Sequence, residues 1–121
     1  MKQQLEVFAA GVTFASLCGP NRQDIINECV GGEAIKLVRQ PSNPHDANAI
    51  LLTLDDGRDI GFVPRDTAED LAPQIDGGAK VSAEITYIDD VETDDGEDGY
   101  LSPCIEITLA PTAPPEADTS R

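Results

Sequence analysis

Arg39-Gln40-Pro41-Ser42-Asn43-Pro44-His45-Asp46-Ala47-Asn48-Ala49-Ile50 is the stretch around which this chain is organised. It contains two prolines, two asparagines and the only histidine, and it separates two runs typical of β-strands, residues 34–38 and 49–54. Proline fixes φ and keeps the residue before it out of the helical region. Asn and Asp side chains also accept hydrogen bonds from nearby backbone amides. The sequence therefore predicts a rigid polar loop that holds its side chains in place.

Two further motifs accompany this loop, Gly11-Val12-Thr13-Phe14 before it and Ile60-Gly61-Phe62-Val63-Pro64-Arg65 after it. Together with Asn43-Pro44-His45-Asp46-Ala47-Asn48-Ala49-Ile50 they resemble the HIRAN domain, a small module of fork-remodelling SWI/SNF-type ATPases that also occurs as single-domain prokaryotic or phage proteins. The likeness spans roughly residues 8–109. It implies a stand-alone protein with one HIRAN-like domain over residues 1–109.

The charge of the chain argues against unassisted binding of phosphate. The formal net charge is -15 over 121 residues, whereas nucleic-acid-binding proteins usually carry a basic face. Residues 1–88 hold 13 acidic against 7 basic side chains, and residues 89–98 alone add seven acids. Any contact with phosphate must therefore be local and sensitive to salt.

Several classes of protein do not fit the sequence. Three cysteines without a Cys-x-x-Cys spacing, and a single histidine, do not predict a disulfide framework, a zinc site or another cofactor site. No nucleophile motif or glycine-rich phosphate loop indicates an enzyme. In the acidic run, the register of a calcium loop would require Val91 and Thr93 as ligands, so a solvated loop is the better interpretation.

Residues 5–10 are too short for a signal peptide, and no run approaches the ~20 apolar residues of a membrane span. We expect a cytoplasmic monomer.

Hydrophobic periodicity and turn residues predict six strands and two short helices. Asn21 is the expected N-cap of the first helix, and Asp66 or Thr67 of the second, which Pro73 should kink. Asp56-Gly57 predicts a hairpin between the third and fourth strands. The predicted strands cover residues 5–14, 34–39, 49–54, 59–63, 80–88 and 104–109. The first helix covers residues 22–29, and the second runs from its cap at residue 66 or 67 to about residue 75.

The fifth strand carries the clearest alternation, with Val81, Ala83, Ile85 and Tyr87 expected on one face. An acidic loop is expected over residues 89–99, and a disordered tail over residues 110–121 because this segment has little apolar content. The pattern alone indicates a mainly β module with helical insertions. The resemblance adds the topology, a small OB-like six-stranded β-barrel.

The resemblance also implies a binding site for the 3' end of a single DNA strand. Aromatic rings stack on the terminal base, an aspartate accepts a hydrogen bond from the 3' hydroxyl, and a basic side chain neutralises the backbone. Asp46 matches the aspartate, and Arg65 matches the basic residue. The residues to which the resemblance assigns this interface are Thr13, Phe14, Asn43, His45, Asp46, Phe62, Arg65 and Tyr100.

Some of these residues have alternative roles. Asn43 can contact the ligand or form the turn, and Phe14 can lie in the pocket or in the core. Tyr100 leaves an acidic loop and is expected at the surface. Arg65 can face phosphate or pair with Asp66 and Glu69. Arg39 is a second candidate for phosphate contact, and Arg22 is a third. His45 and Thr13 depart from the family pattern, which commonly has tyrosine and a basic residue there.

Two functions follow from these observations. The first is a non-enzymatic module that recognises single-stranded DNA, preferentially 3' ends with a free hydroxyl, in DNA repair or replication beside a helicase or nuclease partner. The second is an acidic protein-interaction module or DNA mimic that keeps the HIRAN fold. The position of the carboxylates distinguishes them, because the first requires one groove in which Asp46 is the only acid. That groove should be lined by Asn43, His45, Asp46, Arg65 and Tyr100.

Overall fold

The computed structural model describes residues 3–14, 16, 19–91 and 99–110. Within this part of the chain, six antiparallel strands form one sheet in the order β1-β6-β5-β2-β3-β4. The strands are β1 (Gln3–Phe8), β2 (Ala34–Arg39), β3 (Ile50–Thr53), β4 (Asp59–Phe62), β5 (Lys80–Val91) and β6 (Tyr100–Ala110), and the helices are α1 (Arg22–Asn27) and α2 (Arg65–Asp76).

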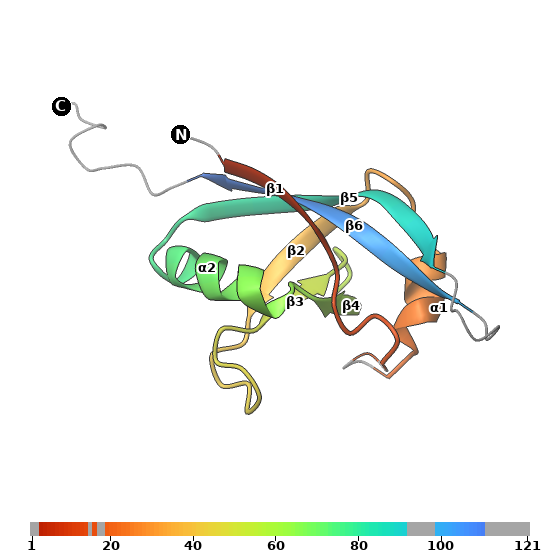
Figure 1. Cartoon of the computed structure of the whole chain (residues 1–121), viewed down its shortest axis with the longest axis horizontal. Helices are drawn as coiled ribbons and strands as arrows, with labels where there is room; N and C mark the ends of the chain where they lie inside the picture. Colours follow the sequence, from red (N-terminus) through yellow and green to blue (C-terminus); the bar gives the residue numbers. More distant parts are fainter. Residues whose placement is uncertain (1–2, 15, 17–18, 92–98, 111–121) are drawn as a thin grey trace.

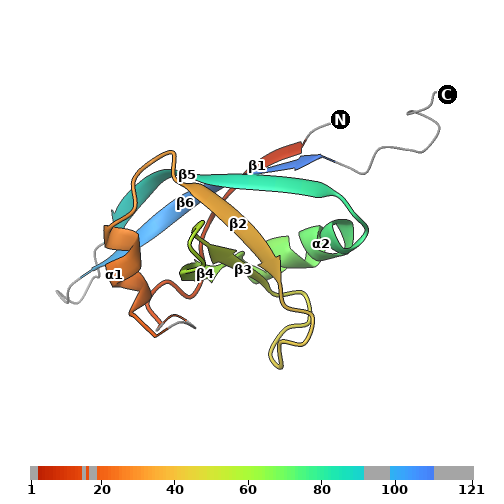
Figure 2. The ribbon, with the colours of Figure 1, turned by 180° about the vertical axis from the view of Figure 1, so that it is seen from behind.

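The sheet curves into an open barrel around an aliphatic core (Figure 1). The long strands β5 and β6, with the shorter β1, form one layer, and both helices lie on the same side of it as β3 and β4; the reverse view agrees (Figure 2). Ile26, Ile50, Leu52, Ile85 and Ile105 are completely buried inside. The predicted mainly β, OB-like fold of six strands and two short helices is confirmed.

A seam between the two edges of the sheet partly closes the barrel. The backbone of Ala10, just after β1, pairs with Phe62 at the end of β4. The Ala10 N–H donates to the Phe62 carbonyl at 2.7 Å, and the Phe62 N–H donates to the Ala10 carbonyl at 2.9 Å. Gly61 permits this approach, since a Cβ atom there would lie 2.6 Å from the Ala10 carbonyl oxygen. The first and the fourth strands are thereby joined.

The first predicted strand, residues 5–14, was too long, because β1 ends at Phe8. Gly11 has φ +73, and the Phe14 N–H donates to its carbonyl at 3.2 Å, so the chain turns there. Ala10 consequently leaves β6 and pairs with Phe62 instead. Gly11, which was expected within the first strand, therefore lies in the turn that follows it.

The two helices are confirmed, with one wrong cap. The Asn21 side chain accepts a hydrogen bond from the Gln23 N–H, as an N-cap should. The second helix begins at Arg65, two or three residues earlier than a cap at Asp66 or Thr67 would give, with Pro64 in the cap position and no side-chain cap. It continues past Pro73 to Asp76.

Among the helices of the described residues, none has the length and apolarity needed to cross a membrane.

Strands β5 and β6 are longer than predicted, because residues 89–91 pair with residues 100–102. Residues 92–98, the centre of the predicted acidic loop, and residues 111–121 of the predicted tail lie outside the described part; Ala110 still belongs to β6. The register of β5 also shifts between Ile85 and Tyr87. Tyr87 is therefore half exposed on the outer face, which corrects its predicted place beside Ile85.

Candidate functional site

The loop between β2 and β3 is built around the side chain of Asn43. Its Oδ1 accepts hydrogen bonds from the backbone N–H groups of His45 (2.8 Å) and Asp46 (3.2 Å), and its Nδ2 donates to Gln40 Oε1 (2.9 Å). Asp46 continues the pattern, since its Oδ1 accepts from the Asn48 N–H at 2.9 Å. Of the two alternatives for Asn43, these contacts favour the turn former.

Arg39 fixes this loop to the end of α2. Its guanidinium donates to the carbonyls of Ala47 (3.0 Å) and Ala49 (2.8 Å) and to both carboxylate oxygens of Asp76 (2.9 and 3.0 Å). The Arg39 bonds hold the pKa of the Asp76 carboxyl below its usual value. Arg39 therefore supports the loop, which corrects its earlier assignment as a phosphate contact.

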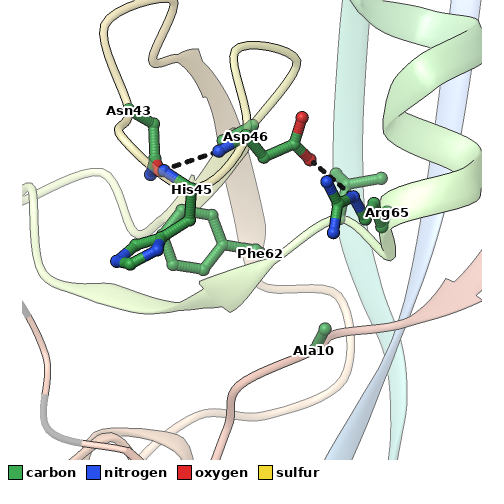
Figure 3. A pocket seen from close by; sticks show the side chains of 8 residues that line it. Ala10, Asn43, His45, Asp46, Phe62 and Arg65 are labelled. Atoms are coloured by element: carbon green, nitrogen blue, oxygen red, sulfur yellow. Dashed lines mark hydrogen bonds and ion pairs between the residues drawn. The ribbon is translucent and has the colours of Figure 1, made fainter.

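A hollow of about 380 Å³ opens between the loop and the end of β4. Asn43, His45 and Asp46 line one side, and Phe62 and Arg65 the other; Ala10, Ala49 and Val63 complete it (Figure 3). Five residues of the predicted interface, from two segments of the chain, thus line this hollow: Asn43, His45, Asp46, Phe62 and Arg65. The floor is largely apolar and the polar groups lie at its rim, an arrangement common in ligand sites.

Asp46 and Arg65 are the charged pair of this hollow. Arg65 Nε lies 3.8 Å from Asp46 Oδ2, too far for a hydrogen bond, and the two side chains are 73% and 20% exposed. Asp46 Oδ1 accepts from the Asn48 N–H of the loop, and Oδ2 is the oxygen nearer to Arg65. In the described residues Arg65 pairs with Asp46 rather than with Asp66 or Glu69.

A second hollow, of about 460 Å³, adjoins the first at Ala10. The predicted residues Thr13, Phe14 and Tyr100 line it, with Phe8 and Ser102. Phe14 is 68% exposed, which excludes it from the core and leaves its ring accessible. Tyr100 is half buried at the start of β6. The eight residues proposed from the sequence therefore divide between two adjacent hollows, five in the first and three in the second.

Carboxylates are scarce in both hollows despite the acidity of the chain. Among the described residues that line them, Asp46 is the only acid, and Arg65 is the only base. The requirement stated for nucleic-acid binding is met in part: the described lining holds no acid other than Asp46, but Tyr100 lies in the second hollow and not in one groove with the other four residues.

Sequence reasoning missed the cluster beneath Phe62. Arg22 is 2% exposed and donates to Asp59 Oδ2 through Nε (2.9 Å) and Nη2 (2.7 Å), and to the Gly11 carbonyl through Nη1 (3.0 Å). Its guanidinium also lies 5.2 Å from the centre of the Phe62 ring. Arg22 thus supports the seam and the ring, and is not available to phosphate. Its place two positions after Pro20 gave no signal of burial.

Open OB-like barrels with a stiff loop, exposed rings and one basic side chain at the rim form a class of small ligand-binding modules. The HIRAN domain model matches residues 2–102 of the chain. The protein therefore belongs to the HIRAN domain family, which is known as a nucleic-acid-binding module.

Two solved structures are similar in fold. The crystal structure of the HIRAN domain of human HLTF superimposes with a TM-score of 0.61 at 19% identity, covering 89% of this chain and 76% of that one. A protein of Lactobacillus plantarum gives a TM-score of 0.60 at 16% identity, covering 88% and 98%. No curated protein sequence matches the chain. At these identities the two structures support the fold alone.

Proposed function

We propose that this protein is a non-catalytic module that binds the 3' end of single-stranded DNA and prefers a free 3' hydroxyl. One observation carries the proposal: Asp46 is the only carboxylate lining the two hollows in the described residues, and its Oδ2 has only the loose 3.8 Å ion pair with Arg65 among the contacts found there. A carboxylate accepts a hydrogen bond from a hydroxyl and repels a terminal phosphate. One charge can therefore distinguish the two kinds of end.

The aromatic side chains suit the bases of such a strand. His45 and Phe62 line the first hollow, and Phe14 and Tyr100 line the second, so a strand crossing the seam at Ala10 meets rings on both sides. Stacking of a base on an aromatic ring is worth ~1 to 3 kcal/mol. We expect the terminal nucleotide in the first hollow and its neighbour in the second.

Arg65 supplies the contact with the backbone phosphate. Its side chain is 73% exposed beside Asp46, so it can reach a phosphate without leaving a buried partner unpaired. We place this activity in DNA repair or replication, where free 3' ends arise, with a helicase or nuclease as partner.

The first test replaces Asp46 by Asn. The amide oxygen can still accept from the Asn48 N–H, so the loop is kept while the charge is lost. A hydrogen bond to a charged group is worth ~1.5 to 3 kcal/mol, so affinity for a 3'-hydroxyl oligonucleotide should fall about 10- to 100-fold. Affinity for the 3'-phosphate form should be unchanged or rise. Fluorescence anisotropy at low salt measures both.

Asp55→Asn is the matched control, since it removes one exposed charge outside both hollows. It should leave the preference of the wild-type protein intact. Equal binding of both ends by the wild-type protein would exclude end recognition. An RNA oligonucleotide of the same sequence, titrated in parallel, shows whether the 2' hydroxyl is tolerated.

A further inference from the structure

The outer face of β1, β6 and β5 is organised in rows that cross the three strands. Leu5, Val7, Ile85 and Ile105 belong to the core or pack against it, so the alternating residues between them point outward. Both helices lie on the other side of this layer (Figures 1 and 2). Two adjacent rows on the outer face follow from the register: Glu6, Glu106 and Glu84, and then Phe8, Cys104 and Tyr87.

The first row places three like charges side by side. Glu6 is directly opposite Glu106, and Glu106 is directly opposite Glu84. Within the described residues none of the three forms an ion pair. Like charges in directly opposed cross-strand positions destabilise a sheet. A face that retains three neighbouring glutamates with no ion pair in the described residues is suited to binding a cation from another molecule.

The second row has an exposed aromatic ring at each end, with the buried Cys104 between them. Phe8 and Tyr87 are 43% and 50% exposed, and their rings meet edge to face at 6.1 Å. The shift in register after Ile85 is what turns Tyr87 outward, since strict alternation would place it on the core side with Ile85. Apolar rings beside three carboxylates provide both parts of a site for a guanidinium or ammonium group.

The charge of this face selects its partner. A DNA strand would be repelled by the row of glutamates, and a second copy of the chain would present the same row. An extended basic segment is complementary instead, because its cations can meet the carboxylates while their stems and guanidinium planes lie on the rings. The three glutamates span about 10 Å, two strand spacings. Two alternate side chains of an extended peptide lie ~7 Å apart, so both fit within the row.

We propose that this outer face, formed by Glu6, Glu84, Glu106, Phe8 and Tyr87, is a docking surface for an arginine-rich extended segment of a partner protein. The surface is separate in function from the DNA end site: neither Tyr87 nor the glutamates line the two hollows, and Phe8 alone borders the second. The protein can therefore hold a basic partner and a DNA end on different faces.

The test uses a fluorescein-labelled peptide of alternating arginine and serine as the probe, titrated by anisotropy with the full chain. Replacing the row by Gln (E6Q, E84Q and E106Q together) should weaken binding about tenfold, as expected for loss of three exposed ion pairs. The control D55N, E69Q and D70N removes three exposed charges elsewhere and should change affinity by less than about twofold. Undetectable binding by the wild-type protein, or equal losses in both variants, overturns the proposal.

Tyr87→Thr tests the aromatic half of the surface while keeping a good strand former. It should weaken the peptide about two- to fivefold, the size of a cation–π contact at an exposed site, and leave 3'-hydroxyl oligonucleotide binding unchanged. If it weakens the oligonucleotide and spares the peptide, the face is part of a DNA path and the proposal fails. Because the oligonucleotide is measured separately, failure of end recognition leaves this test readable.

Discussion

Asn43 and Asp46 share one loop but have different tasks. The Asn43 amide is occupied by the backbone of His45 and Asp46 and by Gln40, so its contribution is the shape of the loop. Asp46 uses one oxygen in the same way and keeps the other at the hollow. The resemblance gave both residues as candidates, and the hydrogen bonds assign Asn43 to support of the loop, while the role of Asp46 as the ligand contact is our proposal.

Arg65 provides the second prediction at this scale. Arg65→Gln removes the base that lines the hollow, so affinity for 3'-hydroxyl and 3'-phosphate oligonucleotides should fall alike. The dependence of log affinity on log salt should become shallower by about 0.7, the value for one phosphate contact on a single strand. Titrations between 50 and 200 mM salt measure this slope.

Arg58→Gln is a suitable comparison, because this arginine pairs with Glu28 and Asp56 away from the hollows. It should alter the slope less than Arg65→Gln does. Identical slopes for Arg65→Gln and the wild-type protein would mean that Arg65 does not contact phosphate.

Among the elements, the edges of the sheet depend on the seam between Ala10 and Phe62. Gly61→Ala would bring a Cβ to 2.6 Å from the Ala10 carbonyl oxygen at a backbone φ of +152. We expect a loss of at least about 2 kcal/mol in the free energy of unfolding, through backbone strain and displacement of the edge. Urea denaturation measures it.

Gly57→Ala is the control that measures the cost of a positive φ without the steric contact present at Gly61. Gly57 also has positive φ, +95, but a Cβ there meets nothing within 4 Å. Its cost should be the conformational term alone, ~1 to 2 kcal/mol. If the Gly61→Ala protein is no less stable than the Gly57→Ala protein, displacing the backbone pairing between Ala10 and Phe62 has no measurable cost in the free energy of unfolding.

Local signals predicted the elements better than their ends. Alternation and turn residues located all six strands and both helices, since periodicity reflects burial along one segment. The end of β1, the outward turn of Tyr87 and the burial of Arg22 depend on partners distant in sequence: Phe62, the register with β6, and Asp59. The loop residues could be named from their motif, but the division into two hollows required the closed sheet.

For the whole molecule, the distribution of charge matters more than the sum of -15. Acids line the outer sheet row and are nearly absent from the two hollows in the described residues. A total charge taken from composition cannot reveal this separation, because the register decides which carboxylates become neighbours.

Acid should remove one stabilising link, the ion pair that joins Arg39 at the end of β2 to Asp76 at the end of α2. Hydrogen bonds from Arg39 lower the pKa of Asp76 below its ordinary value of 3.8, so the ionised form is favoured in the folded state. This stability is fully present above pH 3.8 and is lost as the pH falls through the lower folded pKa. Wild type should therefore melt above Asp76→Asn at pH 7, and the difference should close in strong acid.

Thermal melts of both proteins from pH 7 downwards measure this difference, and the repulsions that they share cancel in the comparison. If the difference in melting temperature between the two proteins increases as the pH falls, the pKa of Asp76 is not lowered in the folded state. The same variant should increase hydrogen exchange in residues 40–49, because Arg39 joins that loop to α2.

The seam at Ala10 has a thermodynamic consequence for any ligand that occupies both hollows. Such a ligand touches both edges of the sheet, which two backbone hydrogen bonds hold together there. It therefore binds only while the barrel is closed, and its binding energy is added to that of the seam. A bound strand end would act as a clasp, making the module most resistant to opening at the moment when it holds its ligand.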